Sequence, residues 1–286
     1  MLNKKALAFD ALSRALRLRK KLGIDLDRPV SAIEIAESLN IEVRLVDLPS
    51  MEGMYIAGPA PKIILSSLRP QGRRNFTCAH ELGHHIYEHG EQFDEITSAK
   101  NISRKNDPKE FSADCFAGYF LMPKALIDSG MKRRNFTYET LEAHQVYALS
   151  SWLGVGYTTL INHMQFGIQM ITQEKSHQLL HYEPQEIRQQ IYPDSAISNL
   201  HVADEHWIGR AIDCEVGDYI SLPKNSILEG VQLDTLENNN GCFLKTRVPG
   251  LAKATNESLG LSIFIRVSPK NYKGRSCYRF EEDVQE

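Results

Sequence analysis

The stretch that decides the fold is residues 74–89, which reads RNFTCAHELGHHIYEH. It contains no proline and is followed by Gly90, so it predicts a helix. Within it, His80-Glu81-Leu82-Gly83-His84 matches the pattern H-E-x-x-H. Residues four apart on a helix share a face, so both imidazoles can reach one metal ion while Glu81 lies nearby to take a proton from water. We therefore predict that His80 and His84 bind zinc (Zn2+), with Glu81 as the general base.

A third ligand is expected on the next helix. Asp107-Pro108 is typical of a helix start, with proline at the first helical position. Glu110 follows His84 by 26 residues, and a carboxylate from this second helix would complete a site of two histidines and one glutamate. Asp114, one turn further on, can accept the other ring N–H of a ligand histidine. The alternative is that Glu110 is an ordinary first-turn acidic residue, which the helix dipole favours.

Histidines cluster around the motif, because four of the ten in the chain fall within positions 80–89. His85 and His89 belong to the same predicted helix as the motif, but on other faces of it. We therefore expect them to be surface residues of that helix and not metal ligands.

The two segments resemble the ImmA/IrrE metallopeptidases, whose members cleave repressor-type transcription factors. The resemblance rests on Phe76–His84 and Glu110–Pro123 and covers roughly residues 1–165. It implies His80, His84 and Glu110 as zinc ligands and Glu81 as the catalytic base. Asp114 stands where the family more often has asparagine, and a carboxylate there should hold a ligand histidine at least as firmly.

The whole chain predicts an α+β protein in three parts. Residues 1–130 are expected to form a zincin-like zinc metallopeptidase domain, with a small β-sheet and the helix of the motif. Residues 131–170 are expected to form a helix-turn-helix-like helical unit. From about residue 171 to 286, strand-forming runs separated by Gly-, Pro- and Asn-rich turns predict a β-rich domain. In the first part, we expect the substrate to add as a strand along the edge at 54–57.

The middle unit rests on the segment 149–160, which has helix-turn-helix spacing. Ser150 is small, Gly154 falls at the turn and Leu160 is an apolar anchor. Reading DNA would require basic or amide side chains at the start of the second helix, but the segment Tyr157–Thr159 stands there. We favour a structural unit, as members of the resembled family commonly carry. The alternative is a helix-turn-helix DNA-binding transcriptional regulator whose metal site is structural.

The resemblance also suggests a role for the β-rich part. Longer members of the family, such as the CapP-type peptidases of CBASS antiphage operons and the radiation-response IrrE type, add a GAF-like sensory domain at this position. This implies cleavage of a cognate repressor after DNA damage, with single-stranded DNA as a candidate activator. Five residues of the C-terminal segment interleave cations with an aromatic ring, a composition typical of nucleic-acid binding: Lys270, Tyr272, Lys273, Arg275 and Arg279. We favour the alternative that this segment is an ordinary solvated edge strand.

Five cysteines are widely spaced and form no C-x-x-C pair, so we expect free thiols. Cys78 and Cys115 flank the ligand positions. A thiolate could occupy the open coordination position of the zinc and keep the enzyme silent. We favour the simpler account, in which both are buried packing thiols.

Composition sets broad limits on the function. The chain has 286 residues, of which 42% are hydrophobic and 24% charged, and a net charge of -3. These values exclude a disordered chain and a general polycation, and the length suggests about two domains. No apolar run approaches a membrane span, so we expect a cytoplasmic protein without a membrane partner. Besides the enzyme and the regulator, a sensor that only binds its ligand stays open.

Overall fold

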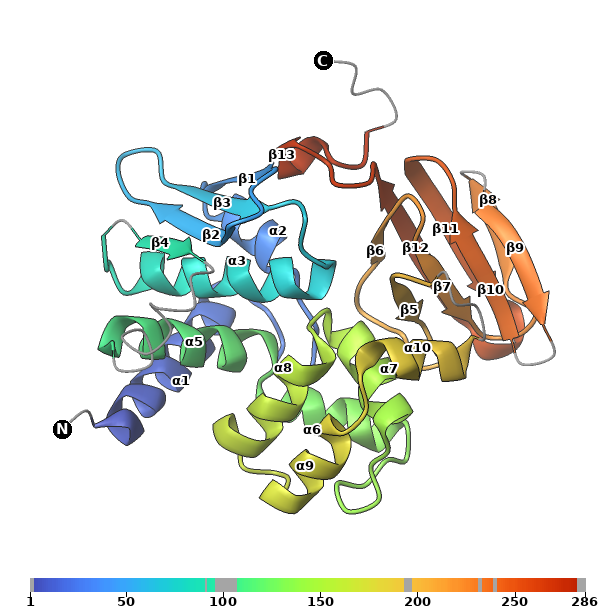
Figure 1. The fold of residues 1–286 in the computed structure, drawn as a ribbon, viewed down its shortest axis with the longest axis horizontal. Helices are drawn as coiled ribbons and strands as arrows, with labels where there is room; N and C mark the ends of the chain where they lie inside the picture. The colour runs from blue at the N-terminus through green and yellow to red at the C-terminus, as the bar shows by residue number, and fades with distance from the viewer. Residues whose placement is uncertain are drawn as a thin grey trace.

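The computed structural model describes residues 3–90, 92–95, 107–192, 197–230, 233–238 and 241–281. It has a mixed α+β architecture in which helices and three small sheets share a large buried cluster. This cluster runs from the first helix, α1 (Lys4–Lys21), to Tyr272 near the C-terminus. Figure 1 shows an N-terminal sheet and helices on one side, a group of helices below, and the C-terminal strands on the other side.

The N-terminal sheet has five strands in the order β13-β1-β3-β2-β4. Within it, β2 (Met51–Ile56) and β3 (Lys62–Ser66) form an antiparallel hairpin. On its other side, β3 pairs in parallel with β1 (Glu42–Val46). β2 is also paired with β4 (Gln92–Glu95). Met54 and Tyr55 of the expected edge are therefore already paired with β4, which contradicts our expectation that a substrate strand adds along 54–57.

The motif lies on α3 (Gln71–Ile86), which packs against α5 (Pro108–Leu121). The side chain of Asp107 accepts a hydrogen bond from the backbone N–H of Lys109, which confirms the predicted start of α5. Gly83 allows the close approach of the two helices, since a Cβ at this position would lie 3.2 Å from the Cα of Ala113. This spacing brings the start of α5 to the motif face of α3.

The end of α3 differs from the expectation. The helix ends at Ile86, with Tyr87 as its cap, and Glu88 adopts a φ of 55°, in the left-handed region. The chain therefore turns out of the helix before His89, so our placement of His89 on a surface of that helix is wrong.

A group of helices follows α5. Their bounds are α6 (Lys124–Arg133), α7 (Ala143–Leu153), α8 (Tyr157–Asn162), a π-helical turn (His163–Gly167), α9 (Gln173–Leu180) and α10 (Pro184–Ile191). Gly154 caps α7 with a φ of 68°, so the turn between α7 and α8 falls where the sequence predicts it. α9 and α10 lie within the part that we expected to be β-rich, and the first strand after them begins at Leu200. The proposed limits of the three domains stay predictions.

The C-terminal part is β-rich, as predicted, and forms two four-stranded sheets, β5-β7-β10-β9 and β6-β12-β11-β8. The strands of the first are β5 (Leu200–Val202), β7 (Tyr219–Leu222), β9 (Leu233–Asn238) and β10 (Gly241–Thr246). Those of the second are β6 (Ile212–Glu215), β8 (Ile227–Gly230), β11 (Gly250–Asn256) and β12 (Leu261–Ser268). α2 (Ala32–Ser38) connects to this part through Glu34, which pairs with Arg266 at 2.5 Å. That the domain is GAF-like stays a prediction.

The chain then returns to the N-terminal sheet. β13 (Gly274–Arg275) pairs antiparallel with β1, which places the red end of the chain beside the blue strands in Figure 1. The hydroxyl of Ser276 donates a hydrogen bond to the carbonyl oxygen of Val43 at 3.0 Å. The C-terminal segment therefore fastens the second half of the chain to the first, which the sequence alone does not predict.

Candidate metal centre

Three side chains from two helices converge at the motif. The Nε2 atoms of His80 and His84 on α3 lie 3.0 Å apart. Glu110 on α5 places Oε2 3.5 Å from Nε2 of His80, and Oε1 3.5 Å from Nε2 of His84. All three residues are buried, and their ligand atoms lie within 4.8 Å of one another. The structure thus brings together the three residues predicted from the sequence.

The hydrogen bond made by Nδ1 of each histidine ring determines whether Nε2 has a free lone pair for a metal ion. Nδ1 of His80 lies 2.8 Å from a carboxylate oxygen of Asp114, so it donates its hydrogen there and leaves a lone pair on Nε2. Nδ1 of His84 lies 2.9 Å from Nδ1 of His89, and donation in that direction leaves the same lone pair. Two lone pairs and the carboxylate of Glu110 then face one point. This donor set fits a divalent cation, and two imidazoles with one carboxylate suit zinc.

Asp114 takes the place that the sequence suggests, whereas His89 was missed as a partner of the site. Because α3 ends early, His89 folds back to His84, and Lys109 donates to its carbonyl oxygen at 3.2 Å. His85 points elsewhere, with Nδ1 2.7 Å from the hydroxyl of Tyr55. No glycine or proline stands between His84 and His89, so the sequence carried no signal for the early end of the helix.

Glu81 is completely buried beneath strand β2. A Cβ on Gly53 of this strand would lie 3.0 Å from Oε1 of Glu81 and 2.5 Å from Cγ2 of Thr77. Glycine is therefore required where β2 crosses the motif, and the backbone of β2 confines the carboxylate beside the ligand histidines.

The two cysteines near the ligands differ in burial, since Cys78 is buried and Cys115 is half-buried. Cys78 is completely buried, and this burial raises the pKa of its thiol. Burial also raises the pKa of Cys115 to about 11. Both side chains are protonated thiols at neutral pH, which is the weaker ligand form. The burial of Cys78 agrees with a packing role, and the zinc-blocking switch stays a prediction.

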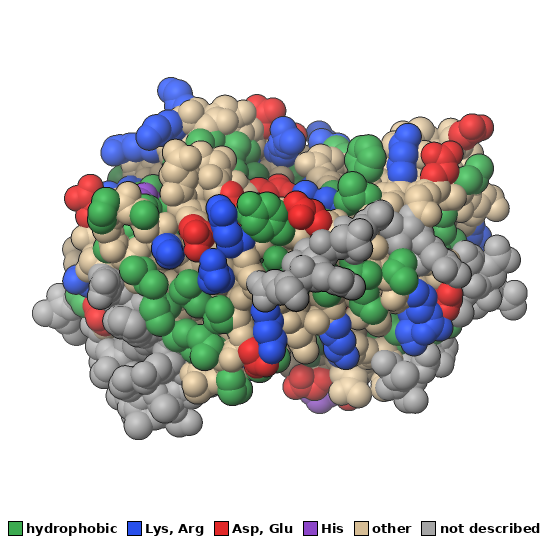
Figure 2. Space-filling view, turned by 90° about the horizontal axis from the view of Figure 1, so that it is seen from above, with side chains coloured by type: hydrophobic (Ala, Val, Ile, Leu, Met, Phe, Trp, Pro, Cys, Tyr) green, Lys and Arg blue, Asp and Glu red, His purple; other side chains and the backbone are tan. Residues whose placement is uncertain are grey.

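The C-terminal residues suggested for nucleic-acid binding do not share one exposed face. Tyr272 and Arg279 are buried, so as surface contacts they are wrong. Lys273 and Arg275 are paired with acidic residues of the N-terminal sheet, at 2.8 Å from Asp47 and 3.7 Å from Glu42. Lys270 is exposed at a different place, in the wall of the cleft. On the face seen in Figure 2, basic and acidic side chains are interspersed.

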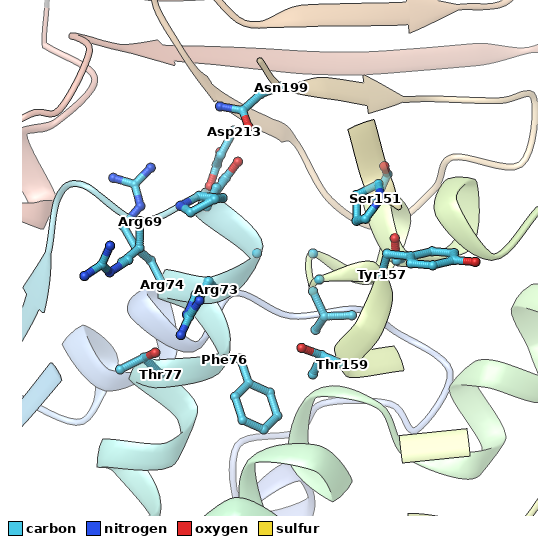
Figure 3. A pocket seen from close by; sticks show the side chains of 18 of the residues that line it. Arg69, Arg73, Arg74, Phe76, Thr77, Ser151, Tyr157, Thr159, Asn199 and Asp213 are labelled. Carbon is cyan, nitrogen blue, oxygen red and sulfur yellow. The ribbon is translucent and has the colours of Figure 1, made fainter. Parts of the chain in front are cut away.

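A cleft of about 1190 Å³ leads away from the metal centre. His80, Glu110 and Thr77 line one end of it, and it continues along the start of α3 to the strands β5 and β6 and the turn at 216–218. Figure 3 shows Arg69, Arg73 and Arg74 on one wall, with Ser151, Tyr157 and Thr159 opposite and Asn199 and Asp213 above them. The candidate centre therefore opens into a space large enough for a polymeric substrate.

An H-E-x-x-H helix beneath a small sheet, with a glutamate from a second helix and an adjoining cleft, is the arrangement expected of a metallopeptidase. Residues 36–160 match the model of the IrrE N-terminal-like domain, a metallopeptidase family. The match contains every residue of the candidate centre and supports a relation to the ImmA/IrrE proteins.

Other comparisons add little. No curated protein matches the chain. A solved structure described as a Mycobacterium tuberculosis transcriptional regulator is similar, with 15% identity and a TM-score of 0.36. The similarity covers 58% of this chain and 52% of that one, so the chain spans about half the length of that protein. In the described residues, no helix has the length and apolar character that crossing a membrane requires.

Proposed function

We propose that this protein is a zinc-dependent endopeptidase that cleaves a transcriptional repressor. The observation that carries the proposal is the convergence of His80, His84 and Glu110 beside the buried Glu81, at the end of an open cleft. A structural zinc site has no need for the cleft or for a glutamate confined beside its ligands.

The residues of the centre have separate roles in the proposed reaction. When bound by His80, His84 and Glu110, zinc supplies a Lewis acid that polarises a carbonyl group and makes water more acidic. Glu81 removes the proton from the attacking water and delivers it to the leaving amine. Asp114 and His89 hold the two ligand rings in the orientation and tautomer that binding requires.

The identity of the substrate and of the signal is proposed from the resemblance to the ImmA/IrrE proteins. The substrate would be a cognate helix-turn-helix repressor in the cytoplasm, whose cleavage derepresses a stress or antiphage operon. DNA damage, signalled by single-stranded DNA, would activate the enzyme through a GAF-like C-terminal domain. The fastening of β13 to the N-terminal sheet supports communication between the two parts.

The second candidate is a DNA-binding regulator with a structural metal site, and α7, Gly154 and α8 are the observation in its favour. α8 offers little for reading DNA, because Tyr157 is buried and its hydroxyl donates to the carbonyl of Leu179. Its exposed positions, Thr158 and Asn162, carry no charge. The geometry therefore favours the peptidase.

Replacing Glu81 with glutamine distinguishes these functions. We expect Glu81→Gln to keep its zinc and to cleave the repressor encoded beside its gene about 10² to 10⁴ times more slowly, since only the base is lost. The assay measures site-specific cleavage with and without single-stranded DNA, and atomic absorption measures the zinc. Glu110→Gln is the control that should lose zinc as well as activity. Full biological activity in Glu81→Gln would defeat the peptidase proposal.

A further inference from the structure

The walls of the cleft beyond the metal centre carry more unpaired positive than negative charge. The acidic residues there are engaged inside the protein, in the following pairs: Glu52 with Arg69 and Arg73, Glu215 with Arg74, Asp213 with Arg266, and Asp218 with His201. Each of these four carboxylates therefore already has an ion-pair partner, and none neutralises a further cation of the cleft.

The cations that line the same walls are more numerous than the acidic residues available to pair with them. Arg69 and Arg73 share one carboxylate, that of Glu52, and the side chain of Arg73 is 60% exposed. Among the described residues, no acid pairs with Arg188 or Lys270, and both line the cleft. The Nε atom of Arg188 is buried without a hydrogen-bond partner in this part of the chain. The guanidinium of Arg188 interacts with the hydroxyl of Tyr147, a neutral partner that leaves its positive charge unbalanced.

A concave site with low-dielectric walls strengthens the field of such cations. The cleft, at about 1190 Å³, exceeds the roughly 300–1,000 Å³ of a small-molecule pocket. A cleft of this size has room for an extended anionic polymer.

Aromatic side chains distinguish between the two kinds of anionic polymer that could bind here, a nucleic acid and an acidic polypeptide. Binding of single-stranded nucleic acid relies on exposed rings on which bases stack. The rings that line the cleft near Arg188 are buried, with Tyr147 8% exposed, Tyr157 4% and Trp207 2%. Their polar atoms already donate to backbone carbonyls of Leu200, Leu179 and Arg210. The half-buried rings of Phe76 and Phe111 line the cleft beside Thr77 and Glu110, at its metal end. The walls near Arg188 offer charge and hydrogen bonds without exposed rings, which fits a polypeptide.

We propose that this cleft binds an acidic segment of the polypeptide substrate, whose Asp and Glu side chains contact Arg73, Arg188 and Lys270. The inference rests on the proposed peptidase function, because it places the bond to be cleaved at the metal end of the same cleft. It makes negative charge on one side of that bond a determinant of specificity.

The test measures binding separately from cleavage, with the zinc-loaded full chain carrying Glu81→Gln. The probes are two fluorescein-labelled Gly-Ser peptides of equal length, one with several Glu residues and one with Gln at the same positions. Fluorescence anisotropy at low salt should show the Glu peptide binding about tenfold more tightly, the effect expected of a few solvent-screened ion pairs. The difference should shrink as salt is added.

The variant Arg73→Gln/Arg188→Gln/Lys270→Gln should bind both peptides equally. A matched control, Lys20→Gln/Lys21→Gln/Lys132→Gln, removes three exposed cations outside the cleft and should keep the preference. Circular dichroism shows whether each variant is folded.

Equal binding of the two peptides by the folded parent protein would overturn the inference. So would an oligothymidylate that displaces the acidic peptide and depends on the same three cations, because the cleft would then be a nucleic-acid site. Cleavage of casein by the zinc-loaded wild-type protein tests the proposed function independently. If the protein cleaves casein but shows no preference for the Glu peptide, the proposed peptidase function stands and the inference about the cleft is refuted.

Discussion

His89 illustrates how one residue outside the motif controls a residue inside it. It holds the ring of His84 through a contact of 2.9 Å between their Nδ1 atoms. We expect His89→Ala to weaken zinc binding about 10- to 100-fold, as is usual when the partner of a metal-binding histidine is removed. Competition with a chromophoric chelator measures the affinity. His85→Ala is the matched control, because His85 contacts Tyr55 and should leave the affinity unchanged. Equal affinities for the two variants would show that His89 is dispensable.

Gly53 controls the base in a similar way. In Gly53→Ala the new methyl group would collide with Cγ2 of Thr77 and press on Oε1 of Glu81. Displacing a catalytic group by about 1 Å can cost about 100-fold in rate, so we expect kcat to fall by at least tenfold while the zinc content stays the same. The double variant Gly53→Ala/Thr77→Ser removes the closer of the two clashing atoms and should regain part of the rate. A normal kcat in the single variant would mean that β2 does not confine Glu81.

At the scale of elements, local signals in the sequence predicted some features and could not predict others. The start of α5 followed from Asp107-Pro108, and the turn before α8 from Gly154, because each residue type has a specific backbone preference. The early end of α3 depends on a left-handed Glu88, which carries no such preference. The pairing of β13 with β1 involves two residues of a strand too short to show alternation.

The candidate centre shows the same division. His80, Glu81 and His84 follow from one helical turn, and Asp114 from one turn after Glu110. The distance between α3 and α5 depends instead on how closely Gly83 approaches Ala113, which is a property of tertiary packing. The spacing of 26 residues between His84 and Glu110 does not by itself distinguish the ligand from the dipole interpretation of Glu110, and the acid at Asp114 is what favoured the ligand in the sequence.

The π-helical turn after α8 carries a pH-sensitive residue. The ring of His163 is buried, and its Nε2 donates to the carbonyl oxygen of Met122 at 2.9 Å. Burial lowers the pKa of His163 to about 4. The unfolded chain takes up a proton below a pKa of about 6.5, while the folded protein does not until about pH 4. The stabilisation is therefore complete above about pH 6.5 and is lost as the pH falls toward 4.

We expect His163 alone to lower the free energy of unfolding by about 1.4 kcal/mol per pH unit in this window. Urea denaturation at several pH values between about 7 and 5 measures it in the wild-type protein and in His163→Gln. Glutamine can still donate a hydrogen bond but does not titrate, so the stability of the variant should depend less steeply on pH. Identical slopes would exclude His163 as the source.

At the scale of the whole molecule, the helix of the motif is fastened to the C-terminal sheets. Arg74 on α3 reaches Glu215 at the end of β6, with 2.5 Å between Nη2 and Oε1. Only 8% and 12% of the two side chains are exposed. The backbone N–H of Asn271 donates to the other oxygen of Glu215 at 3.3 Å. A rearrangement of the C-terminal sheets therefore acts directly on the helix that carries His80 and His84.

Removing one member of this pair leaves a buried charge without its partner. We expect Arg74→Met to lower the free energy of unfolding by about 3–5 kcal/mol, whereas Arg74→Met/Glu215→Met should recover most of the loss, because an apolar pair of similar volume replaces the ion pair. Denaturant unfolding of both single variants and the double variant gives the coupling energy. A loss below about 1 kcal/mol in Arg74→Met would place the pair among solvent-screened surface contacts. If the double variant is stable and binds zinc, its response to the activating signal shows whether the ion pair transmits that signal or only holds the two parts together.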